Sequence, residues 1–425
     1  NANTITIGAS GDTVTLASGA SQSGFGRTGT VDWQTTKKTA SFTAANGEGY
    51  FIDTSGGAVT MTLPASPSAG DIVAFKDYSG DFSTNNLTIG RNGSNLDGTA
   101  GDKAIDTDHT SMSLVYVDGT QGWKSVEEGT GFIGESFIVA SGGTETTCGN
   151  CKIHTFTGPG TFTVCAIATC SANNVVSYAV VAGGAGGGAQ EGGGGGGAGG
   201  FREVKTPVTP YTASPRCGYS TPGNRITVTA TAFPITVGAG GAAGPGGGKG
   251  VCGGVSTFST ITSAGGGGGG AGGDRPGSAG GSGGGGAGRN SEPGGSGNQP
   301  PVTPAQGSNG GNARPGCSPT TDVAGGGGGA TANGGNASTG GPAGPGGAGA
   351  TTNISGSPTG YAGGGGGGTE TGSAGTASDG GGAGAAGPST ATAATANTGG
   401  GGGGAGNGAA AAGGSGIVII RYKFQ

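Results

Sequence analysis

Short runs of alternating apolar and polar residues, separated by glycine and other turn residues, fill the N-terminal part of the chain. The first segment, residues 1–30, contains Ile5, Ile7 and Val14 at spacings that suit short strands. Because successive side chains of a strand point to opposite faces, this alternation is typical of half-buried β structure. We predict a repetitive β shaft here.

The next segment, residues 31–128, has the pattern of an ordinary β domain. YFIDTSGGAVTMTLP, GDIVAFKDYSG and MSLVYVDGTQGWKSV are apolar alternations bounded by turn residues, which favours a β-sandwich or β-prism module. Residues 129–182 follow as a connector. Within it, KIHTFTGPGTFTVCA predicts a β-hairpin in which Phe156 and Phe162 flank a Gly-Pro-Gly turn.

Glycine dominates the rest of the chain. It makes up 113 of the 425 residues, mostly in runs with Ala, Asn and Ser after residue 182. Glycine loses roughly 0.5–1 kcal/mol more than alanine on ordering, so a flexible linker is the first interpretation. Three features favour an ordered structure instead: the length of the segment, the near-regular inserts between its runs, and the apolar strand GIVIIRYKF that closes it.

A bundle of glycine helices of the polyproline-II type, known as polyglycine II, explains these features. Such a helix has three residues per turn and no internal hydrogen bonds, so its N–H and C=O groups must bond to neighbouring helices. Only residues without side chains allow the required approach. Gly277, Gly280, Gly283 and Gly286 show the three-residue period locally. The inserts would then be loops at the two ends of the bundle.

The expected fold class is therefore all-β N-terminal modules followed by a glycine-rich polyglycine-II bundle, with essentially no α-helix. The glycine-rich domain would occupy residues 183–425. Its final strand, GIVIIRYKF, is predicted to pair with SYAVVAGG at the entry to the first glycine run.

The composition offers little for catalysis or for nucleic-acid binding. The net charge is −5 and charged residues are only 10% of the chain, so the basic surface that nucleic acids require is missing. No apolar run reaches the roughly 18 residues of a membrane span. The two histidines, His109 and His154, have no catalytic context. We expect a non-enzymatic protein without a cofactor or metal.

The carboxylates that could carry other chemistry are few. Asp106 and Asp108 in DTDHTS could bind a cation, but an exposed acidic turn is the better interpretation. A polysaccharide depolymerase would need paired carboxylates, and Glu127, Glu128 and Glu135 are the single cluster that offers them.

Four cysteines follow the spacing C-x2-C-x13-C-x4-C: Cys148, Cys151, Cys165 and Cys170. The hairpin prediction places both pairs near the open ends of its strands, where disulfides would close a small loop and suit an extracellular particle. A zinc site is the alternative, since zinc ribbons use similar spacings. The chain has seven cysteines, so at least one is free or paired between chains.

Loops on a rigid scaffold are where binding usually resides, and the inserts between glycine runs are candidates for such loops. The side chains in these inserts best suited to a ligand are Arg216, Tyr219, Arg289, Gln299, Arg314 and Tyr361.

Several strings resemble a known family. GNCKIHTFTGPGTFTV, VVSYAVVAGGAGGG and the terminal GGSGIVIIRYKF are similar to the glycine-rich domain of bacteriophage tail-fibre and adhesin proteins. Upstream, YFIDTSGGAVTMTLPASPSAGDIVAFKDY and NNLTIGRNGSNLDG resemble a β module of marine-phage tail fibres. The cysteine pairs near the hairpin depart from the family pattern.

The resemblance implies a homotrimeric fibre located in the virion, joined to other tail proteins through a segment upstream. Its distal end would consist of polyglycine-II helices whose tip loops touch a bacterial surface glycan or outer-membrane protein. The family has no shared tip-loop motif, so the resemblance assigns no receptor-contacting residues. Two other functions stay open: a secreted structural or ice-binding glycine-rich protein, and a depolymerase.

Overall fold

The computed structural model describes residues 31–129, 137–273, 275–314, 322–338 and 341–425. They form two compact units, one on each side of the boundary between residues 134 and 135. The predicted β shaft lies outside the described residues. Among the described residues there is no α-helix, as predicted, and the helical segments are the short 3-10 turns η1 (Ser171–Asn174), η2 (Pro222–Asn224) and η3 (Arg289–Ser291).

The first unit consists of two sheets packed face to face around one core. One sheet has the order β1-β3-β5-β8-β9, namely Asp32–Lys38, Glu48–Ile52, Ile72–Asp77, Ser111–Asp118 and Gly122–Gly129. The other has the order β2-β4-β6-β7, namely Phe42–Thr43, Val59–Thr62, Leu87–Gly90 and Lys103–Ile105. Phe75, Met61 and Trp123 are fully buried between them. The alternation in the sequence thus sends every second side chain into a shared core.

The second unit begins with another pair of sheets. The order β11-β12-β22-β14-β15 joins Thr144–Cys148, Cys151–Phe156, Ile417–Lys423, Val175–Val181 and Phe201–Val204, with β16 (Ile226–Thr227) also pairing with β14. The order β10-β13-β17-β18-β19 joins Val139–Ser141, Gly160–Ala166, Ala232–Thr236, Ser256–Phe258 and Ile261–Ser263. A separate hairpin consists of β20 (Ala350–Thr352) and β21 (Thr359–Tyr361).

The last strand of the chain occupies the middle of its sheet. β22 pairs with β14 in antiparallel register, with Ile417 opposite Val181, and its other edge pairs with β12. The predicted pairing of GIVIIRYKF with SYAVV is therefore confirmed. All the glycine runs lie between these two paired strands in the sequence. The pairing therefore brings the start and the end of the glycine-rich segment together in one sheet.

The predicted hairpin around Gly158 is wrong. β12 pairs with β11 and β22, whereas β13 pairs with β10 and β17. The two strands thus belong to facing sheets, and both Phe156 and Phe162 are buried in the core between them. Period-two alternation shows which face of a strand is buried but not which strand pairs with it, so a turn between two sheets has the same signal as a hairpin.

A buried histidine lies in this core. The His154 ring is inaccessible to solvent, with Nδ1 2.7 Å from the Gly142 carbonyl oxygen and Nε2 3.0 Å from the Tyr422 hydroxyl. It stacks on Tyr422 and meets the edge of Phe162. Burial lowers the pKa of His154, because the charged form loses its hydration. The neutral ring therefore serves as a structural hydrogen-bonding group.

This burial predicts acid sensitivity. Below the ordinary pKa of 6.5 the unfolded chain takes up a proton that the folded His154 does not, so stability falls as pH falls through that range. We expect the unfolding free energy of the second unit to decrease by up to about 1.4 kcal/mol per pH unit between pH 6.5 and 5. Denaturant titrations at a series of pH values would measure it. A His154→Gln variant should show a flatter profile, and an equal slope in both proteins would contradict the assignment.

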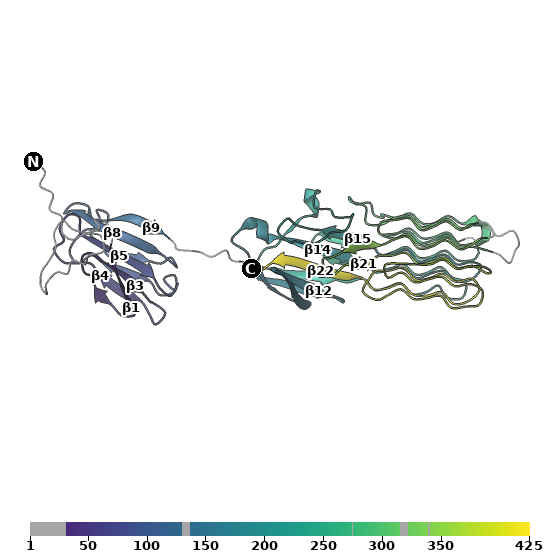
Figure 1. Cartoon of the computed structure of the whole chain (residues 1–425), viewed down its shortest axis with the longest axis horizontal. Coiled ribbons are helices and arrows are strands. Elements are labelled where there is room, and N and C mark those ends of the chain that lie inside the picture. The colour runs from purple at the N-terminus through teal and green to yellow at the C-terminus, as the bar shows by residue number, and fades with distance from the viewer. Residues whose placement is uncertain (1–30, 130–136, 274, 315–321, 339–340) are drawn as a thin grey trace, which may run out of the picture. The chain divides into compact units, whose positions relative to one another are not determined.

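The glycine runs extend from these sheets as parallel and antiparallel extended chains lying side by side (Figure 1). Their hydrogen bonds repeat every third residue. Gly183 and Gly186 donate to the carbonyl oxygens of Gly254 and Val251, at 3.0 Å each. The next residue of each triplet donates to the run 409–416, and the third to the run 193–200. One run thus bonds to three neighbours in rotation, as a polyglycine-II helix must.

Close approach explains why these positions are glycine. A Cβ atom added to Gly195 would lie 2.1 Å from the Gly365 carbonyl oxygen, and one added to Gly184 would lie 1.9 Å from that of Gly400. Neither carbonyl can move without breaking its own ladder of hydrogen bonds. The glycine content is therefore a packing requirement, and the bundle interpretation holds in place of a flexible linker.

Replacing one interior glycine should test this packing. For Gly195→Ala we expect a loss of about 3 kcal/mol in unfolding free energy, since backbone cannot retreat from the added methyl group. Gly158→Ala is the matched control, because no atom lies within 4 Å of its added Cβ; its change should stay within about 0.5 kcal/mol. Denaturant unfolding followed by circular dichroism would measure both. Equal stabilities would rule out the tight bundle.

Candidate binding surfaces of the glycine bundle and the first unit

The course of the first two runs defines two ends of the bundle. Val181 at the end of β14 is paired with Phe201 at the start of β15, so residues 182–200 must run out from the sheet and return. Their turn at Gln190 and Glu191 lies at the end away from the sheets, here called the far end. Eight residues at about 3.1 Å each place it about 25 Å from the strands.

Other turns gather at the far end with this one. Arg289 forms an ion pair with Glu191, and the Gly288 N–H donates to the Gly192 carbonyl at 2.8 Å. The N–H of Glu370 donates to the Asp322 carbonyl oxygen at 3.1 Å. Asp322 also meets this turn, because a Cβ on Gly192 would lie 2.8 Å from its carbonyl oxygen.

The electrostatics of the far end are mixed. The Arg289 cation pairs with the Glu191 carboxylate, and the carboxylates of Asp322 and Glu191 both lie close enough to influence that of Glu370. Partial burial raises the pKa of the Glu370 carboxyl, and the nearby charge of Asp322 adds to the effect. The runs leading to these turns consist largely of Gly, Ala, Ser, Asn and Thr. The charged side chains of the bundle are therefore concentrated in its turns.

The six predicted ligand-contacting residues do not form one site. Arg289 and Arg314 belong to turns at the far end, where the backbone of Arg314 bridges that of Val323. Arg216 and Gln299 lie toward the sheets instead. The loop of Gln299 reaches them through Gln306, whose carbonyl oxygen accepts the Phe201 N–H at 2.7 Å. The predicted ligand-contacting residues are thus divided between the two ends of the bundle.

Two of the six have structural roles instead of exposed positions. The Arg216 guanidinium donates to the Ala330 carbonyl at 3.0 Å and to Ser308 Oγ at 3.4 Å, which ties its loop to glycine runs. Tyr361, the last residue of β21, is 4% exposed, and burial raises the pKa of its hydroxyl. The expectation that Tyr361 belongs to a binding loop is wrong, because the residue ends strand β21 and its aromatic side chain packs inward.

Tyr219 is partly buried against the core of the second unit, and the Arg225 guanidinium lies 4.4 Å from the centre of its ring. That contact covers one face of the ring. The candidates from the sequence did not include Glu191, Asp322 and Glu370, which lie with Arg289 at the far end. Their position at the turns of glycine runs was the available signal, but the sequence does not show which turns share an end.

The cysteines are placed in two different parts of the sheets. Cys148 and Cys151 lie opposite each other across the turn between β11 and β12. Cys165 and Cys170 are both exposed, near the end of β13 and before η1. Within the described part of the chain, no three His, Cys, Asp or Glu side chains converge as a metal site would require. The zinc alternative thus gains no support, and the disulfides stay a prediction.

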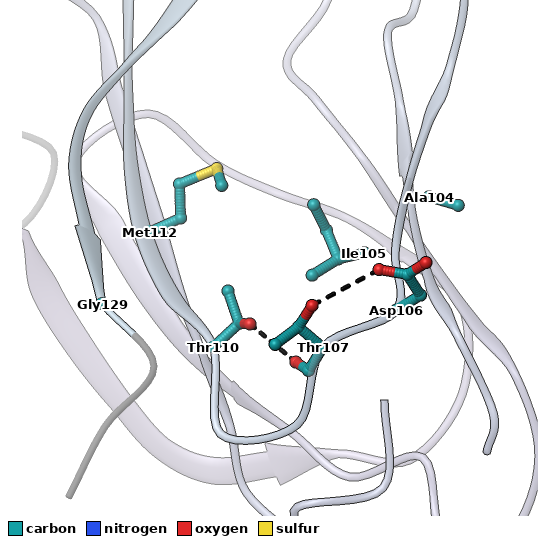
Figure 2. Close-up of a pocket in the computed structure, with 7 residues that line it drawn as sticks. All are labelled: Ala104, Ile105, Asp106, Thr107, Thr110, Met112 and Gly129. Carbon is teal, nitrogen blue, oxygen red and sulfur yellow. Dashed lines mark hydrogen bonds between the residues drawn. The ribbon is translucent and has the colours of Figure 1, made fainter. Parts of the chain in front are cut away.

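A pocket in the first unit opens beside the edge strand β7. It has a volume of about 410 Å³ and is lined by Ala104, Ile105, Asp106, Thr107, Thr110, Met112 and Gly129 (Figure 2). Its polar groups bond to one another: Thr110 Oγ1 donates to the Thr107 carbonyl at 2.6 Å, and Thr107 Oγ1 lies 3.4 Å from Asp106 Oδ1. The pocket therefore presents few convergent groups to a ligand.

Within the described residues, the acidic side chains near this pocket do not converge in a group of three that could hold a metal ion. Asp108 accepts hydrogen bonds from the Ser83 N–H and hydroxyl, which lower the pKa of its carboxyl. Asp106 lines the pocket of Figure 2, whereas Asp108 does not. Of the carboxylate cluster considered for a depolymerase, Glu127 lies on β9, whereas Glu135 is outside the described residues.

The second unit is thus a glycine-helix bundle closed by a β-sandwich, and comparison with known proteins agrees with this class. A family model described as a glycine-rich domain matches residues 155–423. The match covers more than half of the chain, which therefore belongs to this glycine-rich domain family. It runs from β12 to β22, so the family unit includes the strands that close the bundle.

No curated protein matches the chain. Within the residues that the structure describes, no helix is long and apolar enough to span a membrane.

The two ends of the bundle should differ in their tolerance of substitution. Arg216→Ala should cost about 2 kcal/mol of unfolding free energy, because it leaves the buried Ala330 carbonyl without its donor. Arg289→Ala removes only an exposed ion pair and should cost less than about 1 kcal/mol. Thermal and denaturant unfolding of the two variants would measure the contrast. The reverse order of stabilities would show that the far-end turns support the bundle.

Proposed function

We propose that this chain is a bacteriophage tail-fibre protein that attaches the virion to a receptor on the bacterial surface. The observation that carries the proposal is that the two ends of the second unit differ: sheets stand at one end and charged turns at the other. At one end of the unit stand the sheets, which contain β10, and the Phe424 N–H donates to the Asn150 carbonyl oxygen there at 3.0 Å. The described residues at the far end form turns that bear charged side chains on a rigid support.

This arrangement suits binding without catalysis. A preformed scaffold lowers the entropy cost of ordering the turns when they meet a receptor. In the proposed homotrimeric fibre, three copies of the far end add avidity to weak individual contacts. The receptor would be a surface glycan or an outer-membrane protein, and the fibre would be part of the virion, joined through its upstream part to other tail proteins. Neither an enzyme activity nor a cofactor belongs to this proposal.

A binding experiment tests the role of the far end. Fluorescently labelled full-length chain should adsorb to cells of a susceptible strain within a panel of marine bacteria. Combined Glu191→Ala, Arg289→Ala and Arg314→Ala substitutions should reduce adsorption at least tenfold, because they remove ionic contacts from three turns. Gln299→Ala at the opposite end is the control and should bind normally. Adsorption that survives the triple substitution, or none to any strain, would contradict the proposal.

The mass of the native particle provides a second readout. Light scattering should give three times the chain mass of 39.0 kDa. A monomer at micromolar concentration would overturn the trimeric fibre, even if adsorption were observed.

One observation favours a second function, ice binding. Ala409 and Ala412 are exposed at a three-residue step along an outer run, and Thr392 and Thr395 are exposed at the same step on another. Three residues of such a helix rise about 9 Å, so the face has a regular spacing of small side chains. Inhibition of ice recrystallisation by the purified chain would support this function, and normal ice growth would exclude it.

A further inference from the structure

A row of paired residues crosses the whole outer face of the larger sheet of the first unit. Trp33, Gly49, Ala74, Ser113 and Glu127 lie opposite one another, strand by strand, from β1 to β9. Residues paired in register point to the same face of a sheet. An aromatic ring at one edge and a carboxylate at the other are therefore joined by three small residues. Four strand spacings of about 4.8 Å separate their Cα atoms by about 19 Å.

The Trp33 ring lies against the sheet. A Cβ atom on Gly49 would come within 2.8 Å of Trp33 Cδ2 and 2.9 Å of Cε3, so the glycine is what admits the indole. Phe51 supports the ring from the neighbouring row, with ring centres 5.1 Å apart. Even so, Trp33 is 41% exposed. An aromatic surface is thus held in a fixed orientation beside solvent.

Longer side chains flank the small residues on both sides. One adjacent row pairs Phe51 with Lys76, and the other pairs Ile72 with Val115. The Lys76 ammonium group donates to the His109 carbonyl oxygen, which fixes this side chain beside the row of small residues. The result is a trough across the sheet, with a cavity of about 200 Å³ lined by Trp33, Ala74, Phe75, Ser111, Met112, Ser113, Glu127 and Gly129.

The end of the trough opposite Trp33 is polar. Ser113 Oγ lies 3.4 Å from Glu127 Oε2, and Ser111 Oγ lies 3.2 Å from the Gly129 carbonyl oxygen. An ionised carboxylate has about four acceptor positions, so Glu127 has capacity beyond this one contact. Hydroxyls and a carboxylate near an aromatic surface offer both acceptors and donors to a ligand that is itself rich in hydroxyl groups.

We propose that this trough binds an uncharged saccharide chain. A hexose ring has an apolar face of C–H groups, which packs on an indole, and equatorial hydroxyls, which donate to a carboxylate. Glu127 would repel an anionic polysaccharide. An extended peptide fits less well, because peptides add to the edge of a sheet, whereas this trough crosses the face from one edge strand to the other. The site lies in the first unit and does not depend on the function proposed for the far end.

An array of uncharged hexose and N-acetylhexosamine oligosaccharides, probed with the full-length chain, tests the proposal. Ala74→Leu fills the floor of the trough, and Trp33→Ala removes its aromatic end. Both should weaken binding to the recognised oligosaccharides at least tenfold, while Trp33→Phe should retain part of it. Val117→Ala is the matched control, since Val117 is 46% exposed at the end of β8 and does not line the trough.

Intrinsic fluorescence provides a local readout. The chain has two tryptophans, and Trp123 is fully buried, so the exposed Trp33 dominates the part of the emission accessible to acrylamide. A bound oligosaccharide should protect Trp33 from acrylamide quenching. Circular dichroism and the melting temperature verify that each variant is folded.

Three results would overturn the proposal. One is no binding to any uncharged oligosaccharide on the array, and another is equal binding by wild type, Ala74→Leu and Trp33→Ala. The third is binding that the far-end triple substitution abolishes and the trough variants leave intact. This last result would still support the proposed function. If the far-end substitutions abolished cell adsorption but left array binding unchanged, saccharide binding by the trough would be independent of the far end.

Discussion

The hydrogen bond between adjacent glycine runs is the interaction on which the second unit depends. Each run turns once every three residues and has no bonds within itself, so its order comes entirely from its neighbours. The contact is short because no side chain intervenes, as the 2.1 Å approach at Gly195 shows. Many such bonds together offset the large entropy cost of ordering glycine.

The sheets at one end of the bundle hold together the chain segments that enter and leave it. β22 lies between β12 and β14, so the strands before and after the glycine runs form one sheet. This sheet and the sheet that faces it bury Phe162, Phe258 and Tyr422 between them in a conventional apolar core. The bundle lacks large side chains, and this sandwich supplies the apolar burial that the bundle cannot. At the opposite end the described residues form turns, which lie outside the packing of this sandwich.

The two candidate surfaces use different physical principles. At the far end, ionic side chains such as Arg289 and Glu191 occupy turns whose positions are set by the rigid runs behind them. In the first unit, the register of five strands aligns Trp33 with Glu127, although nearly one hundred residues separate them in the chain. Rigid backbone fixes side-chain positions in both, and neither surface needs a catalytic group.

The sequence by itself determined the all-β class and the polyglycine-II packing, because both depend on local period and composition. It also indicated the pairing of the final strand, because the two apolar strings SYAVVAGG and GIVIIRYKF stand at the two boundaries of the glycine runs. Long runs made almost entirely of glycine favour packed polyglycine-II helices, and alternation shows which face of a strand is buried. The tertiary structure decided which elements meet. It assigned Phe156 and Phe162 to facing sheets, buried Tyr361, and separated Arg216 from Arg289. Strand partners, register and the grouping of turns are non-local, so no pattern within one segment specifies them.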